Sequence, residues 1–183
     1  LESADVRGID VALLVDPARV AVTSAELARA CTALNTGIVD AASDCAAGEW
    51  PLYSRPPLAV GLTVDGEPLL VFVMHMKSKR GGAIETAPRR LAQAAHIAEL
   101  VAAELAVNPE AGVLVLGDLN DYDLSPPLQV LTANGHLVNV LQQVPAAQRY
   151  SYNFGGVSQL IDGILVSPAL AARLAEVTIQ HVN

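Results

Sequence analysis

The sequence predicts a mixed α/β or α+β sandwich rather than a regular doubly wound sheet. Several short apolar runs are bounded by turn residues, which is typical of strands, and only one long stretch has helical spacing. A hydrophobic content of 52% with 16% charged residues excludes a disordered chain. With 183 residues, the chain is long enough for one domain with a sizeable core.

The first third of the chain is predicted to contain one strand followed by a long irregular segment. Residues 9–15 are apolar except for Asp10 and predict a strand. Residues 18–54 have weak periodicity, with one possible short helix around residues 26–34, and they contain both cysteines. Because long irregular segments inside a domain are usually functional or inserted, we expect a cysteine-containing insertion at about 18–54.

The middle of the chain predicts a hairpin and then the long helix. The apolar runs 58–64 and 69–73 are joined through Asp65-Gly66, a strong signal for a tight turn between antiparallel strands. Residues 86–107 carry apolar side chains at helical spacing, with Thr86 as a possible cap. The sequence therefore predicts two paired strands followed by a helix.

The last third is predicted to combine three strands with two short helices. We expect strands at 113–116, 160–166 and 177–182, and short helices that begin at the Ser-Pro pairs 125–126 and 167–168. The first of these helices is expected to end near Gly135. No apolar run is long enough to cross a membrane.

The charge of the chain is acidic overall but unevenly distributed. A net charge of −8 argues against indiscriminate electrostatic binding to nucleic acid. Five of the eleven basic side chains nevertheless fall within one short stretch: Lys77, Lys79, Arg80, Arg89 and Arg90. This stretch is either a solvated face or an anion-binding patch.

The two cysteines, Cys31 and Cys45, flank a polar segment. They have neither CxxC spacing nor a nearby histidine pair, so a metal site is not indicated. A disulfide in an exported protein is the favoured interpretation, and two unpaired thiols are the alternative. Closing a loop of this length would stabilise the fold by roughly 3 kcal/mol.

A carboxylate and a carboxamide follow the apolar run 113–116. Gly117 would let the chain turn there, which would deliver Asp118 and Asn120 to the rim of a sheet, where α/β proteins bind ligands. These two side chains suit a hard cation such as Mg²⁺ or its bound water. By themselves, the same residues are better explained as an ordinary turn.

Other polar residues occupy similar positions. His75 directly follows the second strand of the predicted hairpin, and Lys77 comes shortly after it. Arg55 precedes two prolines at the start of that hairpin. Asp162 lies inside the apolar run 160–165, so we expect it to be hydrogen-bonded or paired. Together with the turn at 118–120, these residues outline a phosphate site in which Arg55 and Lys77 supply charge and His75 a hydrogen bond.

Four segments in order resemble the endonuclease/exonuclease/phosphatase superfamily, which has the DNase I-like fold. They are Ser-Arg-Pro-Pro-Leu at 54–58, His-Met-Lys-Ser-Lys at 75–79, Gly-Asp-Leu-Asn-Asp-Tyr at 117–122, and Tyr-Ser-Tyr-Asn-Phe at 150–154 with Leu-Ile-Asp-Gly-Ile-Leu-Val-Ser at 160–167. The resemblance covers nearly the whole chain. The most similar branch is that of secreted bacterial nucleases, which carry a comparable cysteine-containing insertion.

The resemblance implies a four-layer α/β sandwich and metal-dependent hydrolysis of phosphoesters, usually phosphodiesters. Asp118 would orient or deprotonate the attacking water with help from Asn120, and both would lie near a divalent cation. His75 would bind phosphoryl oxygens, and Arg55 would steady the site or contact phosphate. Asp162 would match the acid that supports phosphate or a partner histidine. The cation is expected to be Mg²⁺, with Mn²⁺ or Ca²⁺ as alternatives.

The sequence also departs from the family pattern. The family has an early Asn, a Glu metal ligand and a late Ser-Asp-His, and none of these is present. We therefore expect residues 1–183 to be an interior part of the domain, incomplete at both ends and with little activity alone. Met74 replaces an Asn that donates to phosphate in the secreted branch, and Gly163 stands where a histidine is common.

The functional hypothesis is part of a secreted, metal-dependent nuclease that acts on DNA or RNA outside the cell. One alternative keeps the fold but has a lipid or small-molecule phosphoester as substrate. A further alternative is a catalytically inactive binding module of an exported protein.

Overall fold

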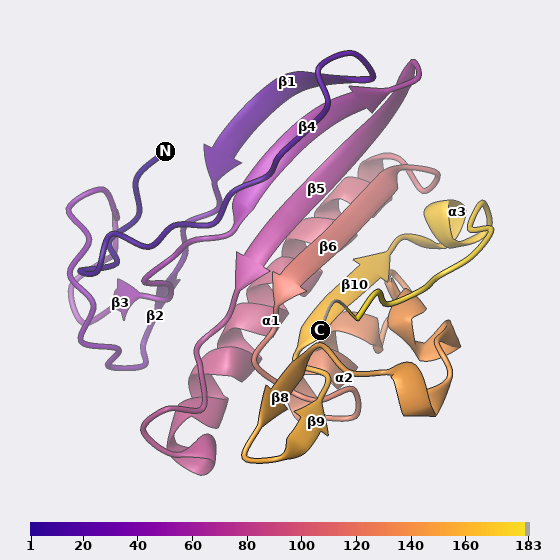
Figure 1. Cartoon of the computed structure of the whole chain (residues 1–183). Helices are drawn as coiled ribbons and strands as arrows, with labels where there is room; N and C mark the ends of the chain where they lie inside the picture. Colours follow the sequence, from indigo (N-terminus) through magenta and orange to yellow (C-terminus); the bar gives the residue numbers. More distant parts are fainter. Residues whose placement is uncertain (182–183) are drawn as a thin grey trace.

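A computed structural model describes residues 1–181. Its centre is a six-stranded sheet with the strand order β1-β4-β5-β6-β10-β7 (Figure 1). These strands are β1 (Val20–Leu27), β4 (Leu58–Val64), β5 (Glu67–His75), β6 (Gly112–Asp118), β10 (Asp162–Val166) and β7 (Val138–Asn139). Only β5 and β6 are parallel to each other, and the other neighbours are antiparallel. The predicted mixed α/β class is confirmed.

The helices lie mainly along one face of this sheet. The long helix α1 (Ala83–Val107) connects β5 to its parallel neighbour β6, and α2 (Pro126–Thr132) packs beside it (Figure 1). The shorter helical segments are α3 (Pro168–Ala171), η1 (Val140–Gln143) and η2 (Ala146–Gln148). Two small two-stranded sheets pair β2 (Cys31–Thr32) with β3 (Trp50–Pro51), and β8 (Tyr152–Phe154) with β9 (Val157–Gln159). None of the helices within residues 1–181 is both long and apolar enough to span a membrane.

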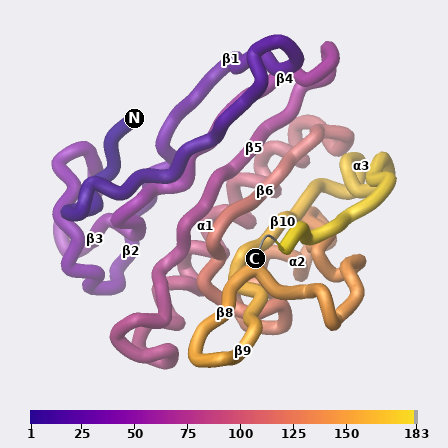
Figure 2. The backbone as a smooth tube through the Cα atoms, viewed as in Figure 1, coloured from indigo at the N-terminus to yellow at the C-terminus, as the bar shows by residue number. Residues whose placement is uncertain are grey.

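Apolar side chains fill both faces of the central strands. On the helical face, Phe72 and Met74 of β5 are buried in one cluster with Ile97 of α1. On the opposite face, Val71 and Val73 belong to a second cluster. Extended chain near the N-terminus covers that face, where Val11, Leu13 and Val15 pack against it (Figure 2). Burial on both faces explains why the strands have continuous apolar runs instead of alternating polarity.

The hairpin between β4 and β5 follows the prediction. Asp65 and Gly66 have φ angles of 51° and 88°, so both adopt the left-handed conformation that a tight hairpin turn requires. The pairing runs from Val64 opposite Glu67 to Leu58 opposite Val73. The strand at 113–116 and the helices beginning at the two Ser-Pro pairs are likewise confirmed, within a few residues at their ends.

Three predictions of secondary structure in the terminal regions are wrong. Residues 9–15 are extended but form no strand, because they pack on the face of the sheet through side chains. The helix expected around 26–34 is absent, since its first residues belong to β1, which pairs with β4. Residues 177–181 of the predicted last strand are irregular, and Val182 lies outside the described residues.

Thr86 does not cap the long helix. The helix begins at Ala83, with Gly82 at the N-cap position, so Thr86 lies within the first turn. Its hydroxyl donates a hydrogen bond to the carbonyl oxygen of Gly82 at 2.6 Å. That carbonyl oxygen already accepts the backbone N–H of Thr86 at 3.2 Å, so the hydroxyl satisfies none of the free N–H groups at the helix start.

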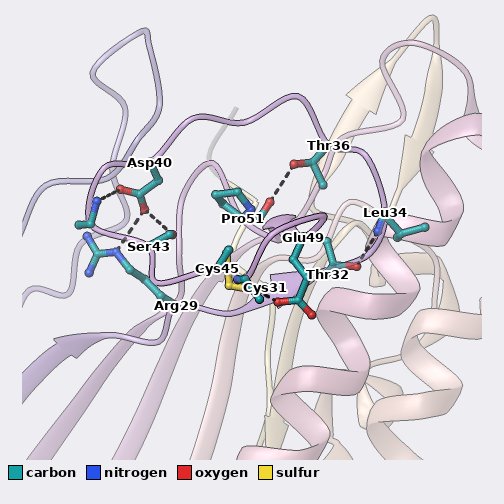
Figure 3. Close-up of a disulfide and its surroundings, with 12 residues drawn as sticks. Arg29, Cys31, Thr32, Leu34, Thr36, Asp40, Ser43, Cys45, Glu49 and Pro51 are labelled. Carbon is teal, nitrogen blue, oxygen red and sulfur yellow. Dashed lines mark hydrogen bonds and ion pairs between the residues drawn. A yellow bond between two sulfur atoms is a disulfide. The ribbon is translucent and has the colours of Figure 1, made fainter.

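The segment before β4 is held by a disulfide between Cys31 and Cys45 (Figure 3). The same loop is supported by an ion pair from Arg29 Nε to Asp40 Oδ2 at 3.2 Å. The predicted disulfide is thus present in the structure. Because β1 joins the central sheet, the irregular part of the expected insertion is confined to residues after Leu27.

Candidate functional site

The register of the sheet brings three predicted site residues to one edge. His75 ends β5 and lies opposite Asp118, which ends the parallel strand β6. Asp162 begins the antiparallel strand β10 and is also paired with Asp118. Because parallel strands end at the same edge of a sheet, residues far apart in the sequence meet there.

A close approach of two strands shapes the backbone at this edge. Gly117 has a φ angle of 129°, and a Cβ atom added to it would collide with the carbonyl oxygen of Met74. Only glycine combines this backbone conformation with this contact. The glycine before Asp118 is therefore required by the pairing of β5 with β6.

Hydrogen bonds fix the turn that follows. The backbone N–H of Asn120 donates to Asp118 Oδ1 at 2.9 Å, and Asn120 Nδ2 donates to the carbonyl oxygen of Met76 at 3.1 Å. Asn120 itself has a φ angle of 51°, a conformation that asparagine tolerates better than most residues. Since its amide nitrogen is used to hold the loop, its carbonyl oxygen Oδ1 is the atom suited to binding a cation.

Asp118 is a half-buried acid with little compensation for its charge. Its Oδ2 lies 3.6 Å from Nε2 of His75, and its side chain is 30% exposed. Burial raises the pKa of Asp118, and the nearby negative charge of Asp162 raises it further, against the lowering effect of the Asn120 N–H. A carboxylate with a raised pKa is a better proton acceptor than an ordinary aspartate.

The protonation state of His75 follows from its contact with Arg55. The Nη1 group of Arg55 lies 2.9 Å from His75 Nδ1. A guanidinium can only donate, so Nδ1 accepts, and the neutral ring carries its proton on Nε2, toward Asp118. Burial lowers the pKa of His75, and the positive charge of Arg55 lowers it further. His75 is therefore a neutral hydrogen-bond donor at neutral pH.

Arg55 contacts His75 from the side of Nδ1 and also lies beside Asp5, an acid that the sequence did not single out. Arg55 is 8% exposed, and its Nε lies 3.4 Å from Oδ2 of Asp5. An aspartate in an irregular N-terminal segment carries no recognisable sequence signal. Its place beside Arg55 depends on contacts between residues 50 positions apart.

Lys77 is turned into its own loop. Its ammonium group donates to the carbonyl oxygens of Ser78 at 3.1 Å and Arg80 at 3.0 Å. Burial lowers the pKa of Lys77, and the positive charge of Arg89 lowers it further. These contacts do not bring its ammonium group to His75, and a phosphate-binding role for Lys77 stays a prediction.

Two expectations about neighbouring residues are wrong. Asp162 is exposed at the first position of β10, so it does not need the partner expected for a buried acid. Met74 is 2% exposed and packs in the core on the helical face, because alternation along β5 turns it away from the face of His75. Replacement of an asparagine by Met74 therefore removes no donor from the edge where His75 and Asp118 meet. At Gly163, a Cβ atom would collide with the side chain of Leu119, so a larger residue would require repacking.

Asp118 and Asn120 offer the oxygen ligands that a hard divalent cation prefers. These two residues alone are too few to complete its coordination. Mg²⁺ takes six oxygen ligands and often keeps several waters, so one or two protein groups can hold it. Within residues 1–181, no group of three or more His, Cys, Asp or Glu side chains is arranged to hold a metal ion. A metal-binding role for Asp118 and Asn120 therefore stays a prediction.

Comparison with known proteins identifies the family. A model of the endonuclease/exonuclease/phosphatase family matches residues 1–181. The chain belongs to this family. No significant match was found among curated proteins.

Solved structures with the same fold come from distant relatives. Truncated TDP2 from Caenorhabditis elegans is 18% identical, with a TM-score of 0.57 over 81% of this chain and 53% of the other. A mannosyl-6-phosphatase from Bacteroides thetaiotaomicron is 16% identical, with a TM-score of 0.53 over 84% and 55%. The human Nocturnin catalytic domain with bound sulfate is 15% identical, with a TM-score of 0.52 over 83% and 50%. The chain thus spans about half the length of these structures and shares their DNase I-like fold.

Proposed function

We propose that this chain carries part of the active site of a metal-dependent phosphodiesterase, most consistent with a secreted nuclease that hydrolyses DNA or RNA. The observation that carries this proposal is the pairing of a neutral histidine donor with an acid of raised pKa. His75 Nε2 and Asp118 Oδ2 are 3.6 Å apart at the edge where β5 and β6 end. Membership of the endonuclease/exonuclease/phosphatase family supports a hydrolytic reaction at phosphorus.

In the proposed reaction, each side chain acts on a phosphoester placed at this edge. The Nε2–H of His75 donates to a non-bridging phosphoryl oxygen and stabilises the charge that develops there. Asp118 orients the attacking water and accepts its proton, and the carboxamide of Asn120 helps to position that water. A divalent cation, Mg²⁺ in the first place, would be held by Asp118 and Asn120 and would polarise the phosphoryl group when bound.

A second candidate is a phosphoesterase for lipid or small-molecule substrates, and the basic residues favour it. Arg90 is buried, and Lys79 forms an ion pair with Asp121 at 3.0 Å. The ammonium group of Lys77 is bound by two loop carbonyls. Arg89 Nε donates to the carbonyl oxygen of Leu52 at 2.9 Å. Four of the five clustered basic groups are therefore engaged within the protein, which reduces the positive surface available to a nucleic-acid backbone.

The experiment is a substrate comparison with the full-length protein. Cleavage of DNA, RNA, a sphingolipid and a sugar phosphate is measured with Mg²⁺ and again with excess chelator. The proposal expects turnover of DNA or RNA that the chelator abolishes and that Asp118→Ala reduces at least about 100-fold. Asp44→Ala, the same change at an exposed aspartate, serves as the matched control.

Each other outcome has a defined meaning. Turnover of the sphingolipid or sugar phosphate alone favours the second candidate. Absence of turnover on all four substrates favours the inactive binding module. Activity that survives Asp118→Ala removes this residue from the mechanism.

The proposed extracellular location rests on the disulfide, because such bonds persist in oxidising compartments. The intact mass of the protein purified from its native compartment is expected to increase by two hydrogens on reduction. An unchanged mass would mean that the cysteines are thiols in that compartment, and it would remove the argument for export.

A further inference from the structure

Asp5 is a buried acid that the proposed reaction does not use. Its side chain is only 5% exposed, although it lies in an irregular segment near the N-terminus. Arg7 donates to both of its carboxylate oxygens, from Nε to Oδ1 at 3.0 Å and from Nη2 to Oδ2 at 2.9 Å. The same Oδ2 lies 3.4 Å from Nε of Arg55. One carboxylate thus lies between two guanidinium groups.

Arg55 depends on this carboxylate more than Arg7 does. The Arg55 side chain is 9% exposed, whereas that of Arg7 is 58% exposed and is well solvated. The Nε atom of Arg55 is buried without a hydrogen bond of good geometry among the described residues, and Asp5 is the carboxylate beside it. Because a buried charge is costly without a partner of opposite sign, removing Asp5 would leave the Arg55 guanidinium poorly compensated.

Because the guanidinium of Arg55 is planar, its contact with Asp5 also determines its contact with His75. The nitrogens of the group are held in one rigid plane, so the position of Nε determines where Nη1 lies. Nη1 is the group that contacts Nδ1 of His75 at 2.9 Å. Asp5, Arg55 and His75 therefore form a continuous chain of contacts that ends beside Asp118.

We propose that Asp5 is a positioning residue that holds the Arg55 guanidinium against His75 Nδ1, so that the Nε2–H of the histidine faces Asp118. This inference rests on the proposed function for the use of that N–H as a donor to phosphate. The contacts themselves belong to the folded chain and exist without substrate. A different role for Asp5, namely stabilising only the N-terminal turn through Arg7, makes the opposite prediction for His75.

The test uses nitrogen NMR of the ¹⁵N-labelled full-length protein at a pH where His75 is neutral. In the wild type we expect a scalar coupling across the hydrogen bond between Arg55 Nη1 and His75 Nδ1, with the ring proton on Nε2. Asp5→Asn removes the negative charge but keeps an oxygen that can accept the Arg7 backbone N–H, which Asp5 Oδ1 accepts at 2.9 Å. This variant is expected to lose the coupling, and a fraction of the rings should carry the proton on Nδ1.

Arg7→Gln is the matched control. It removes the other cation bound to Asp5 but leaves the Asp5–Arg55 contact, so the coupling and the ring tautomer should be those of the wild type. A folded Asp5→Asn variant that retains the wild-type coupling would overturn the proposal. Loss of the coupling in Arg7→Gln but not in Asp5→Asn would also overturn it, because Asp5 would then act through the turn.

A second variant keeps the test decisive if Asp5→Asn does not fold. Asp5→Ser has a hydroxyl that can still accept the N–H two residues later and support the turn, but it has no charge for Arg55. The same loss of coupling is expected, and its persistence would contradict the proposal. Because this measurement needs no turnover, it can fail while the proposed hydrolase is active, and it can succeed if the protein proves inactive.

Discussion

Asp118 and Asp121 lie three residues apart, yet the structure gives them opposite environments. Asp121 Oδ2 is bound by Arg90 Nε at 2.8 Å, and its Oδ1 by Lys79 Nζ at 3.0 Å. Asp118 has a backbone hydrogen bond from Asn120, and the nearby His75 is neutral. One carboxylate is fully paired, and the other retains an oxygen with which to act.

The pKa values of Asp118 and Asp121 are shifted in opposite directions, as expected from these environments. Burial alone would raise the pKa of both. At Asp121 the hydrogen bond from Arg90 and the ion pair with Lys79 outweigh burial and lower the pKa. At Asp118 burial prevails, and the negative charge of Asp162 adds to it. A single sequence motif thus contains a structural acid and a candidate catalytic acid.

Arg90 accounts for the paired environment of Asp121. It is 1% exposed and also donates to the hydroxyl of Thr86 at 2.7 Å and to the carbonyl oxygen of Lys77 at 3.2 Å. These bonds tie the first turns of α1 to the loop after β5 and to the loop after β6. This cluster therefore links the loop that follows Asp118 to the helix.

The largest expected change in stability is that of Asp121→Ala. The substitution leaves the buried Arg90 guanidinium without its carboxylate, so the free energy of unfolding should fall by about 3–5 kcal/mol. Urea denaturation of the purified chain measures this value. Arg80→Ala, at an exposed position nearby, should change it by no more than about 0.5 kcal/mol. A loss below about 1 kcal/mol for Asp121→Ala would show that the two acids are not energetically distinct.

Gly117→Ala should have the next largest effect, because it disturbs the strand pairing that positions Asp118. A methyl group there meets the Met74 carbonyl oxygen at a φ angle of 129°, so we expect a loss of about 2 kcal/mol. Gly135→Ala is the matched control, since Gly135 also has a positive φ angle, 68°, but a Cβ there meets no atom. Equal losses for the two variants in urea denaturation would argue against the close approach as the cause.

Asp118→Asn should have a small effect on stability. Its charge is poorly compensated, so the variant is expected to lie within about 1 kcal/mol of the wild type at neutral pH, on the stable side. The full-length protein with this change should nevertheless lose turnover. A clear loss of stability would place Asp118 with Asp121 among the structural acids.

The smallest expected effect is the pH dependence of the difference in stability between the wild type and Asp118→Asn. The folded pKa of Asp118 is raised above 3.8, so its ionised form costs stability, and the cost is complete above the folded pKa. As the pH falls from that value to 3.8, the stability advantage of Asp118→Asn over the wild type should disappear. Asp121 has the opposite sign, because its lowered pKa contributes stability above 3.8 that is lost as the pH falls through the folded value. Urea denaturation of the wild type and of Asp118→Asn, from neutral to acidic pH, tests the prediction for Asp118. A stability advantage of Asp118→Asn that grows as the pH falls would contradict it.

The sequence by itself determined the features that depend on neighbouring residues. The Asp65-Gly66 turn fixed the β4–β5 hairpin, since both residues tolerate positive φ angles. Apolar runs followed by His75 and Asp118 indicated the ends of two strands. The ordered motifs identified the family, which the family model confirms.

Tertiary structure alone decided the surroundings of each polar residue. Residues 9–15 and β1 were misassigned because their conformations depend on packing and pairing with distant strands. Asp5 reaches Arg55 only in the folded chain, and Asp121 differs from Asp118 because α1 brings Arg90 to one and not to the other. The charge and hydrogen bonding of a buried carboxylate depend on the groups around it in space, and the local sequence does not specify those groups.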